Sequence, residues 1–107
     1  MSTTQVTAEM LSQLTDNQHR FYEAIHDLHP RLLNVWDWQQ RSVDVATFEK
    51  AIKAMSHGEK IFARFLLSLW FGEDDERSKF SFMEAANILD NSKRLFIAQW
   101  LIDPWWP

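Results

Sequence analysis

Residues 56–72 read SHGEKIFARFLLSLWFG, and this stretch decides the fold. Ser56 and Glu59 have the spacing of a capping box, which predicts that a helix begins after Ser56. Gly72 is well placed to end that helix. Apolar side chains lie on both sides of it: Phe62, Phe65, Leu66, Leu69 and Trp70 on one, Leu67 and Phe71 on the other. A helix that is apolar nearly all round is a buried helix, so we predict a central helix over residues 57–71.

The chain before this helix also has helical periodicity. Apolar residues recur at three- and four-residue steps between residues 7 and 28, which predicts one amphipathic helix with Thr7 as its N-cap. Pro30 prevents a smooth continuation. A second short helix is predicted over residues 45–55, with Asp44 as its cap. Residues 30–38 leave two alternatives open: a short helix with proline in its first turn, or an ordered loop anchored by tryptophans.

The chain after the central helix predicts two further helices. Ser81 and Glu84 form a second capping box before a short helix. Asp90 or Ser92 can cap a last helix, in which Ile97, Trp100 and Leu101 share a face, and Pro104 ends it. No segment alternates as a strand does, so the fold class is all-α, a compact bundle of five or six short helices. Two helix-loop-helix units around the central helix are one arrangement that fits this pattern. We expect a flexible segment over residues 1–6 and a single helical domain over residues 7–107.

Composition restricts the class of protein. Apolar residues make up 46% of the 107 residues and charged residues 24%, so the chain should fold. It has no cysteine, which excludes disulfides and thiolate chemistry and fits a reducing compartment. We see neither a signal peptide nor a membrane-spanning stretch, and therefore expect a cytoplasmic protein without a membrane partner. A net charge of -4 argues against nucleic acid as the partner.

One candidate metal site lies on the first predicted helix. His19, Glu23 and His26 fall at positions i, i+4 and i+7, which places three potential ligands on one face. The pattern differs from the H-E-x-x-H motif of zinc peptidases, in which the glutamate directly follows the first histidine. Polar helix faces also collect such residues by chance, and that is the simpler interpretation.

A candidate anion or ligand site lies where the central helix begins. Gly58 stands in the first turn, where the lack of a side chain would let a ligand approach the free amide groups. His57 and Lys60 flank it and would suit an anion. The alternative, which we favour, is that Gly58 allows close packing against a neighbouring helix.

Six tryptophans are the strongest anomaly of the sequence. Trp70 and Trp100 belong to predicted apolar helix faces. The other four are candidates for binding a partner, because tryptophan is enriched at binding hot spots: Trp36, Trp38, Trp105 and Trp106. Since Pro104 stops the last helix, Trp105 and Trp106 either fold back on the protein's own core, which we favour, or meet another chain.

These features favour a small non-catalytic protein-protein interaction module, such as an adaptor, inhibitor or regulatory subunit, that uses an aromatic surface. Its partner would be another protein, including a second copy of this chain as a homodimer. The alternative is a helical protein that binds a small ligand or a metal through its histidine and glutamate helix face. We expect no enzyme and no cofactor, because no nucleophile and base are paired in the sequence.

Overall fold

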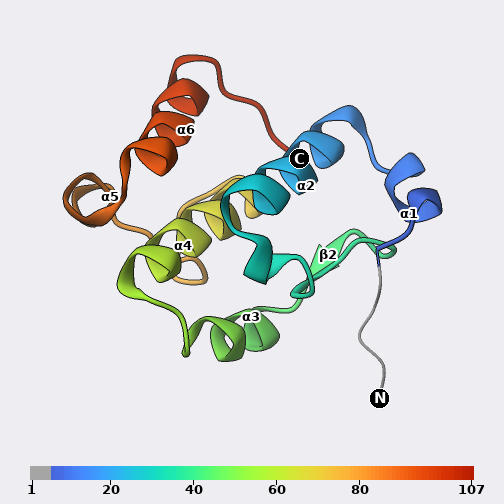
Figure 1. Cartoon of the computed structure of the whole chain (residues 1–107), viewed down its shortest axis with the longest axis horizontal. Coiled ribbons are helices and arrows are strands. Elements are labelled where there is room, and N and C mark those ends of the chain that lie inside the picture. Colours follow the sequence, from blue (N-terminus) through green and yellow to red (C-terminus); the bar gives the residue numbers. More distant parts are fainter. Residues whose placement is uncertain (1–5) are drawn as a thin grey trace. The chain divides into compact units, whose positions relative to one another are not determined.

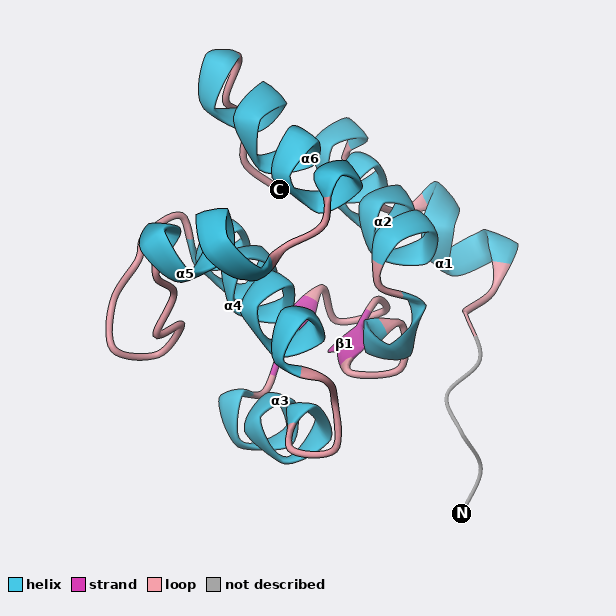
Figure 2. Ribbon diagram, turned by 60° about the vertical axis from the view of Figure 1, so that its left-hand side comes forward, coloured by secondary structure: helices cyan, strands magenta, loops and turns pink. Residues whose placement is uncertain are grey.

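The computed structural model describes residues 6–107, and in these residues the protein is all-α, as predicted (Figure 1). The expected flexible segment falls, except for residue 6, outside the described residues. The α-helices are α1 (Ala8–Ser12), α2 (Asp16–Leu28), α3 (Val45–Ile52), α4 (His57–Phe71), α5 (Phe82–Ile88) and α6 (Asn91–Ile102). A short 3-10 helix, η1 (Pro30–Leu32), and two short antiparallel strands, β1 (Trp36–Asp37) and β2 (Ser42–Val43), complete the described elements (Figure 2).

The chain divides into two compact units, and the single helical domain that we expected over residues 7–107 stays a prediction. The first runs to Ala51 and includes Pro107, and the second runs from Ile52 to Trp106. Each unit contains a group of aromatic rings in mutual contact. The first group is centred on Phe21 and Trp36, and the second on Phe65.

The first unit breaks the long helix that we predicted between residues 7 and 28. Thr7 does cap α1, since its hydroxyl oxygen accepts a hydrogen bond from the amide of Met10. A capping box at Thr15 and Gln18 then starts α2, with both reciprocal hydrogen bonds formed at 3.1 Å. Gln18 interrupts the apolar spacing, and the prediction of one continuous helix was wrong because Thr15 caps a new helix and Gln18 completes its capping box.

The segment that follows Pro30 combines the two alternatives left open by the sequence. Pro30 begins the 3-10 helix η1, and the chain then forms an ordered loop that buries Trp36 and Trp38. The ring of Trp36 lies 5.3 Å from that of Phe21, and the indole N–H of Trp38 donates to the carbonyl oxygen of Leu33. Two-residue strands are too short to alternate visibly, so the sequence did not reveal them.

The first helix that lies wholly in the second unit is α4, which has the predicted bounds. Its capping box is complete, because Ser56 and Glu59 exchange both hydrogen bonds. Gly72 ends the helix in the left-handed conformation, with φ of 75°. Seven of the α4 side chains are buried: Ile61, Phe62, Ala63, Phe65, Leu66, Leu67 and Leu69.

α6 packs against α4 through aromatic rings. Phe96 lies 5.8 Å from Phe62, and Trp100 lies 5.7 Å from Phe65. Leu101, which we placed on the same face as Trp100, does line the same pocket as that ring, yet it is 53% exposed.

We expect Ser56→Ala to lower the free energy of unfolding by about 1 kcal/mol, because it removes the side-chain cap of α4. The melting temperature should fall by roughly 5 °C in calorimetry. Ser42→Ala is the matched control, since Ser42 is exposed in β2. An equal effect of the two substitutions would contradict the assigned role of the capping box.

Asp90 caps α6 and should make stability depend on pH. A hydrogen bond from the amide of Lys93, together with those from the Ser92 hydroxyl and the Lys93 ammonium, lowers the pKa of Asp90 to about 2. The stabilising effect of its charge is therefore present above the ordinary value of 3.8 and is lost as pH falls toward 2.

Asp90→Asn retains the cap but removes the charge. The wild type should melt above this variant at pH 5, and the difference should shrink as the pH falls and disappear below a pH of about 2 in thermal unfolding. A difference in melting temperature that is constant over this range would contradict the prediction.

Candidate functional site

The large apolar side chains that are exposed in residues 6–107 all belong to the second unit. They lie on α5, on α6 and at the C-terminus, and we call them the apolar surface: Phe82, Met83, Ile88, Leu95, Leu101, Ile102 and Trp106. Ile102 is the most exposed, at 83%. Such a concentration is typical of a binding surface rather than of scattered exposed residues.

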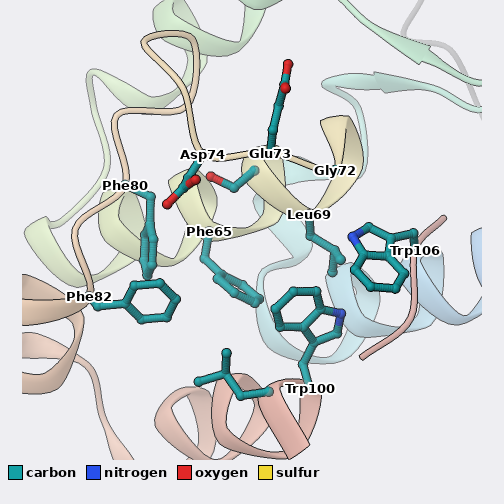
Figure 3. Close-up of a pocket in the computed structure, with 11 residues that line it drawn as sticks. Phe65, Leu69, Gly72, Glu73, Asp74, Phe80, Phe82, Trp100 and Trp106 are labelled. Atoms are coloured by element: carbon teal, nitrogen blue, oxygen red, sulfur yellow. The ribbon is translucent and has the colours of Figure 1, made fainter. Parts of the chain in front are cut away.

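An aromatic pocket of about 300 Å³ opens within the second unit (Figure 3). α4 and α6 contribute opposite walls, and the loop after Gly72 and the C-terminal segment complete it. Five aromatic residues line it: Phe65, Phe80, Phe82, Trp100 and Trp106. This volume lies at the lower end of the range for small-molecule pockets.

The five rings of the aromatic pocket contact one another edge to face. Trp106 meets Trp100 at 81° and a centroid distance of 5.9 Å, and Trp100 meets Phe65 at 80° and 5.7 Å. Phe65 meets Phe80 at 63° and 5.4 Å, and Phe80 meets Phe82 at 80° and 4.8 Å. The pocket walls are therefore steeply inclined rings that support each other.

The C-terminal segment is held at this pocket by a hydrogen bond. After Pro104 the chain turns back, and the indole N–H of Trp100 donates to the carbonyl oxygen of Trp105 at 2.7 Å. A Cβ atom at Gly72 would lie 3.6 Å from a ring carbon of Trp106, so the end of α4 and the terminal indole lie close together. Trp105 is only 7% exposed, whereas Trp106 is 53% exposed.

The carboxylates at the rim of the pocket differ in whether they form ion pairs. Arg77 lies 2.7 Å from Glu73 and 2.8 Å from Asp75, and its hydrogen bond holds the pKa of Asp75 below the ordinary value. Asp74 also lines the pocket, yet it makes no hydrogen bond or ion pair within residues 6–107. Figure 3 shows Asp74 beside Phe80, whereas Glu73 extends away from the rings.

A second groove lies between α5 and α6 and has a volume of about 220 Å³. Three alanines contribute to its lining, which leaves room for side chains of another molecule: Ala85, Ala86 and Ala98. Phe82 and Leu101 line both the groove and the aromatic pocket, so the two hollows are adjacent.

The structure changes the interpretation of the four tryptophans predicted to bind a partner. Trp36 and Trp38 are each 3% exposed, and Trp105 is 7% exposed. We predicted that the tryptophans of residues 30–38 form an exposed aromatic surface, and this prediction was wrong. The rings of Trp36 and Trp38 pack against each other and against Phe21 in the first unit. Trp106 alone among the four remains available to a partner.

The predicted metal ligands do not gather into a site. His19 pairs with Glu23 at 3.4 Å, while His26 contacts Asp27 at 3.0 Å. The ring of Tyr22 contacts both histidine rings, with centroids 6.4 and 6.2 Å away. In the described part of the chain no group of three or more histidine, aspartate or glutamate residues could hold a metal ion.

The predicted anion site at His57, Gly58 and Lys60 is adjacent to two carboxylates. Glu84 lies 3.5 Å from the His57 ring, and Glu59 accepts a hydrogen bond from the amide of Ser56. The two carboxylates disfavour a bound anion. A Cβ atom at Gly58 would lie 3.9 Å from Ile88, in ordinary van der Waals contact, so the packing that we favoured for Gly58 does not require glycine and stays a prediction.

Sequence reasoning missed the apolar surface, although one signal for it was present. Leu95 and Ile102 lie off the predicted buried face of the last helix, seven residues apart. Residues at that spacing lie on the same side of a helix, so they indicated a second apolar stripe.

The chain was compared with protein family models, with curated proteins and with solved structures, and none of them matches. Among residues 6–107, no helix has the length and apolar character needed to cross a membrane. The functional interpretation therefore rests on the geometry of the second unit.

The two C-terminal tryptophans should respond differently to truncation. Trp105→Ala should lower the free energy of unfolding by about 3 kcal/mol, because it removes a buried indole. Trp106→Ala should cost about 1 kcal/mol, mainly through the lost edge-to-face contact with Trp100. Urea unfolding of both variants measures the difference, and equal losses would contradict it.

Proposed function

We propose that this protein is a small non-catalytic interaction module that binds another protein through its apolar surface. The observation that carries the proposal is the location of the exposed large apolar side chains, all of which lie between residues 82 and 106 in the described chain. Water contact with these side chains is unfavourable, and a partner that covers them would gain stability from their burial.

The groove between α5 and α6 favours an amphipathic helix as the partner segment. A helix binds a groove by inserting apolar side chains spaced three and four residues apart. The alanines of the groove permit a close approach, and Phe82 and Leu101 supply apolar edges. We therefore propose a partner helix with a large apolar face.

Charge at the groove adds a second property of the partner. Arg94 lines the groove and donates to the carbonyl oxygen of Ala86 at 3.3 Å and to the side chain of Asn91. It stands in the first turn of α6, where a cation opposes the helix dipole. An acidic residue at the edge of the partner helix would compensate this charge.

Ala98→Glu should weaken the binding of the partner at least about tenfold, because its longer charged side chain occupies the groove and pairs with Arg94, which lies four residues earlier in the same helix. Gln99→Glu is the matched control, since it adds the same charge to the next, exposed residue of α6, which does not line the groove. The wild type would first be used to capture partners from its source cells, and each partner would be cross-linked to it. The affinity of each partner for the wild type and for both variants would then be measured by calorimetry.

Cross-links from the partner to α5 or α6, with weaker binding of Ala98→Glu only, support the proposal. Equal binding by both variants would overturn it. Analytical ultracentrifugation identifies a second copy as the partner if the wild type and Gln99→Glu are dimers while Ala98→Glu is a monomer.

A further inference from the structure

We infer that the aromatic pocket binds an organic cation, an alkylammonium group carried by a small molecule or by a side chain. This inference goes beyond the proposed protein-binding role and does not depend on it. It rests on the angles between the rings of the pocket, on the one unpaired carboxylate among those that line it, and on a buried hydroxyl that has no partner.

The rings supply surfaces that attract a cation. An aromatic ring is negative on its faces, and several rings arranged at steep angles can surround an alkylammonium group. Trp100 forms such a corner with Phe65, at 80°, and a second one with Trp106, at 81°. Phe80 and Phe82 form another, at 80°. A flat apolar ligand would instead favour parallel walls.

Asp74 supplies the charge that would select a cation over a neutral ligand. Arg77 forms ion pairs with its neighbours Glu73 and Asp75, but Asp74 makes no ion pair in the described residues. It lines the pocket beside Phe80 (Figure 3). A carboxylate next to an apolar pocket attracts a cation more strongly than one surrounded by water.

The same loop already contains a comparable arrangement. The guanidinium carbon of Arg77 lies 4.0 Å from the ring centroid of Phe71, and Glu73 and Asp75 hold the group there. Arg77 is therefore bound elsewhere and does not fill the aromatic pocket. At Phe71 the cation above the ring is a side chain of the same protein, Arg77. In the aromatic pocket the cation would come from another molecule.

Ser68 adds a polar group to the pocket lining. Its hydroxyl oxygen is buried and has no hydrogen-bond partner among residues 6–107. An unsatisfied buried hydroxyl is unfavourable. The oxygen is inaccessible in this conformation, so the Ser68 side chain has to rotate toward the pocket before a hydroxyl or N–H group of a ligand can form a hydrogen bond with it. Choline has a hydroxyl group two carbon atoms from its cationic nitrogen and is therefore a suitable probe.

Choline and its neutral isostere 3,3-dimethylbutan-1-ol have the same shape and differ in charge. We expect choline to shift the NMR signals of the Trp100 and Trp106 indole N–H groups and to bind at least about tenfold more tightly than the isostere. Equal affinities would overturn the inference in favour of a purely apolar pocket. The absence of choline binding at ~10 mM would also overturn it.

Asp74→Asn should weaken choline binding severalfold, whereas Glu76→Gln should leave it unchanged. Both substitutions remove one negative charge from the same exposed loop, but Glu76 does not line the pocket. Equal effects would show that only the net charge of the loop matters and would contradict the role of Asp74.

The source of the cation is distinguished by a parallel titration with N-acetyl-trimethyllysine amide. Tighter binding of this compound than of choline identifies a side chain as the source, and the reverse order identifies a free small molecule. Ala98→Glu should bind choline as the wild type does, because Ala98 does not line the pocket. If choline does not bind, the protein-binding proposal is unaffected. If no protein partner binds the groove, the inference about the aromatic pocket is unaffected.

Discussion

The ring of Phe65 is the contact on which the second unit depends. It lies 5.4 Å from Phe80, 6.3 Å from Phe96 and 5.7 Å from Trp100, so one side chain of α4 joins the loop before α5 to α6. Phe65 is 3% exposed and also lines the aromatic pocket. Phe65 therefore contributes both to the stability of the unit and to the candidate site, because the rings that hold α6 in place also form the pocket walls.

Helix ends were the most predictable part of the fold, because capping is a local interaction. Ser56, Gly72 and Ser81 act where their sequence context predicted, within three or four residues of their hydrogen-bond partners. The break before α2 was equally local but was hidden by the strong apolar spacing around it, so Gln18 was interpreted as a gap in one helix. Burial was harder to predict, since Ile97 and Leu101 share a face of α6, yet the first is 5% and the second 53% exposed.

The candidate site was not predictable from the sequence, because its parts come from distant segments. Phe65, Phe80 and Trp106 meet only after the loop and the C-terminal segment have folded onto α4 and α6. The sequence did identify the terminal tryptophans as unusual and Pro104 as the point where the helix must stop. The sequence alone could not show that Trp105 is buried while Trp106 is half-exposed. This difference depends on the turn that the hydrogen bond from Trp100 fixes.

The acidic run over residues 73–76 illustrates how one arginine can make neighbouring charges unequal. In the sequence these four carboxylates form a uniform, solvated stretch. In the structure Arg77 bridges Glu73 and Asp75, whose side chains it can reach together, and stacks on Phe71. Asp74 is left at the edge of the pocket without a compensating charge. An exposed ion pair adds little stability, so the larger effect of Arg77 is to decide which carboxylate remains available to a ligand.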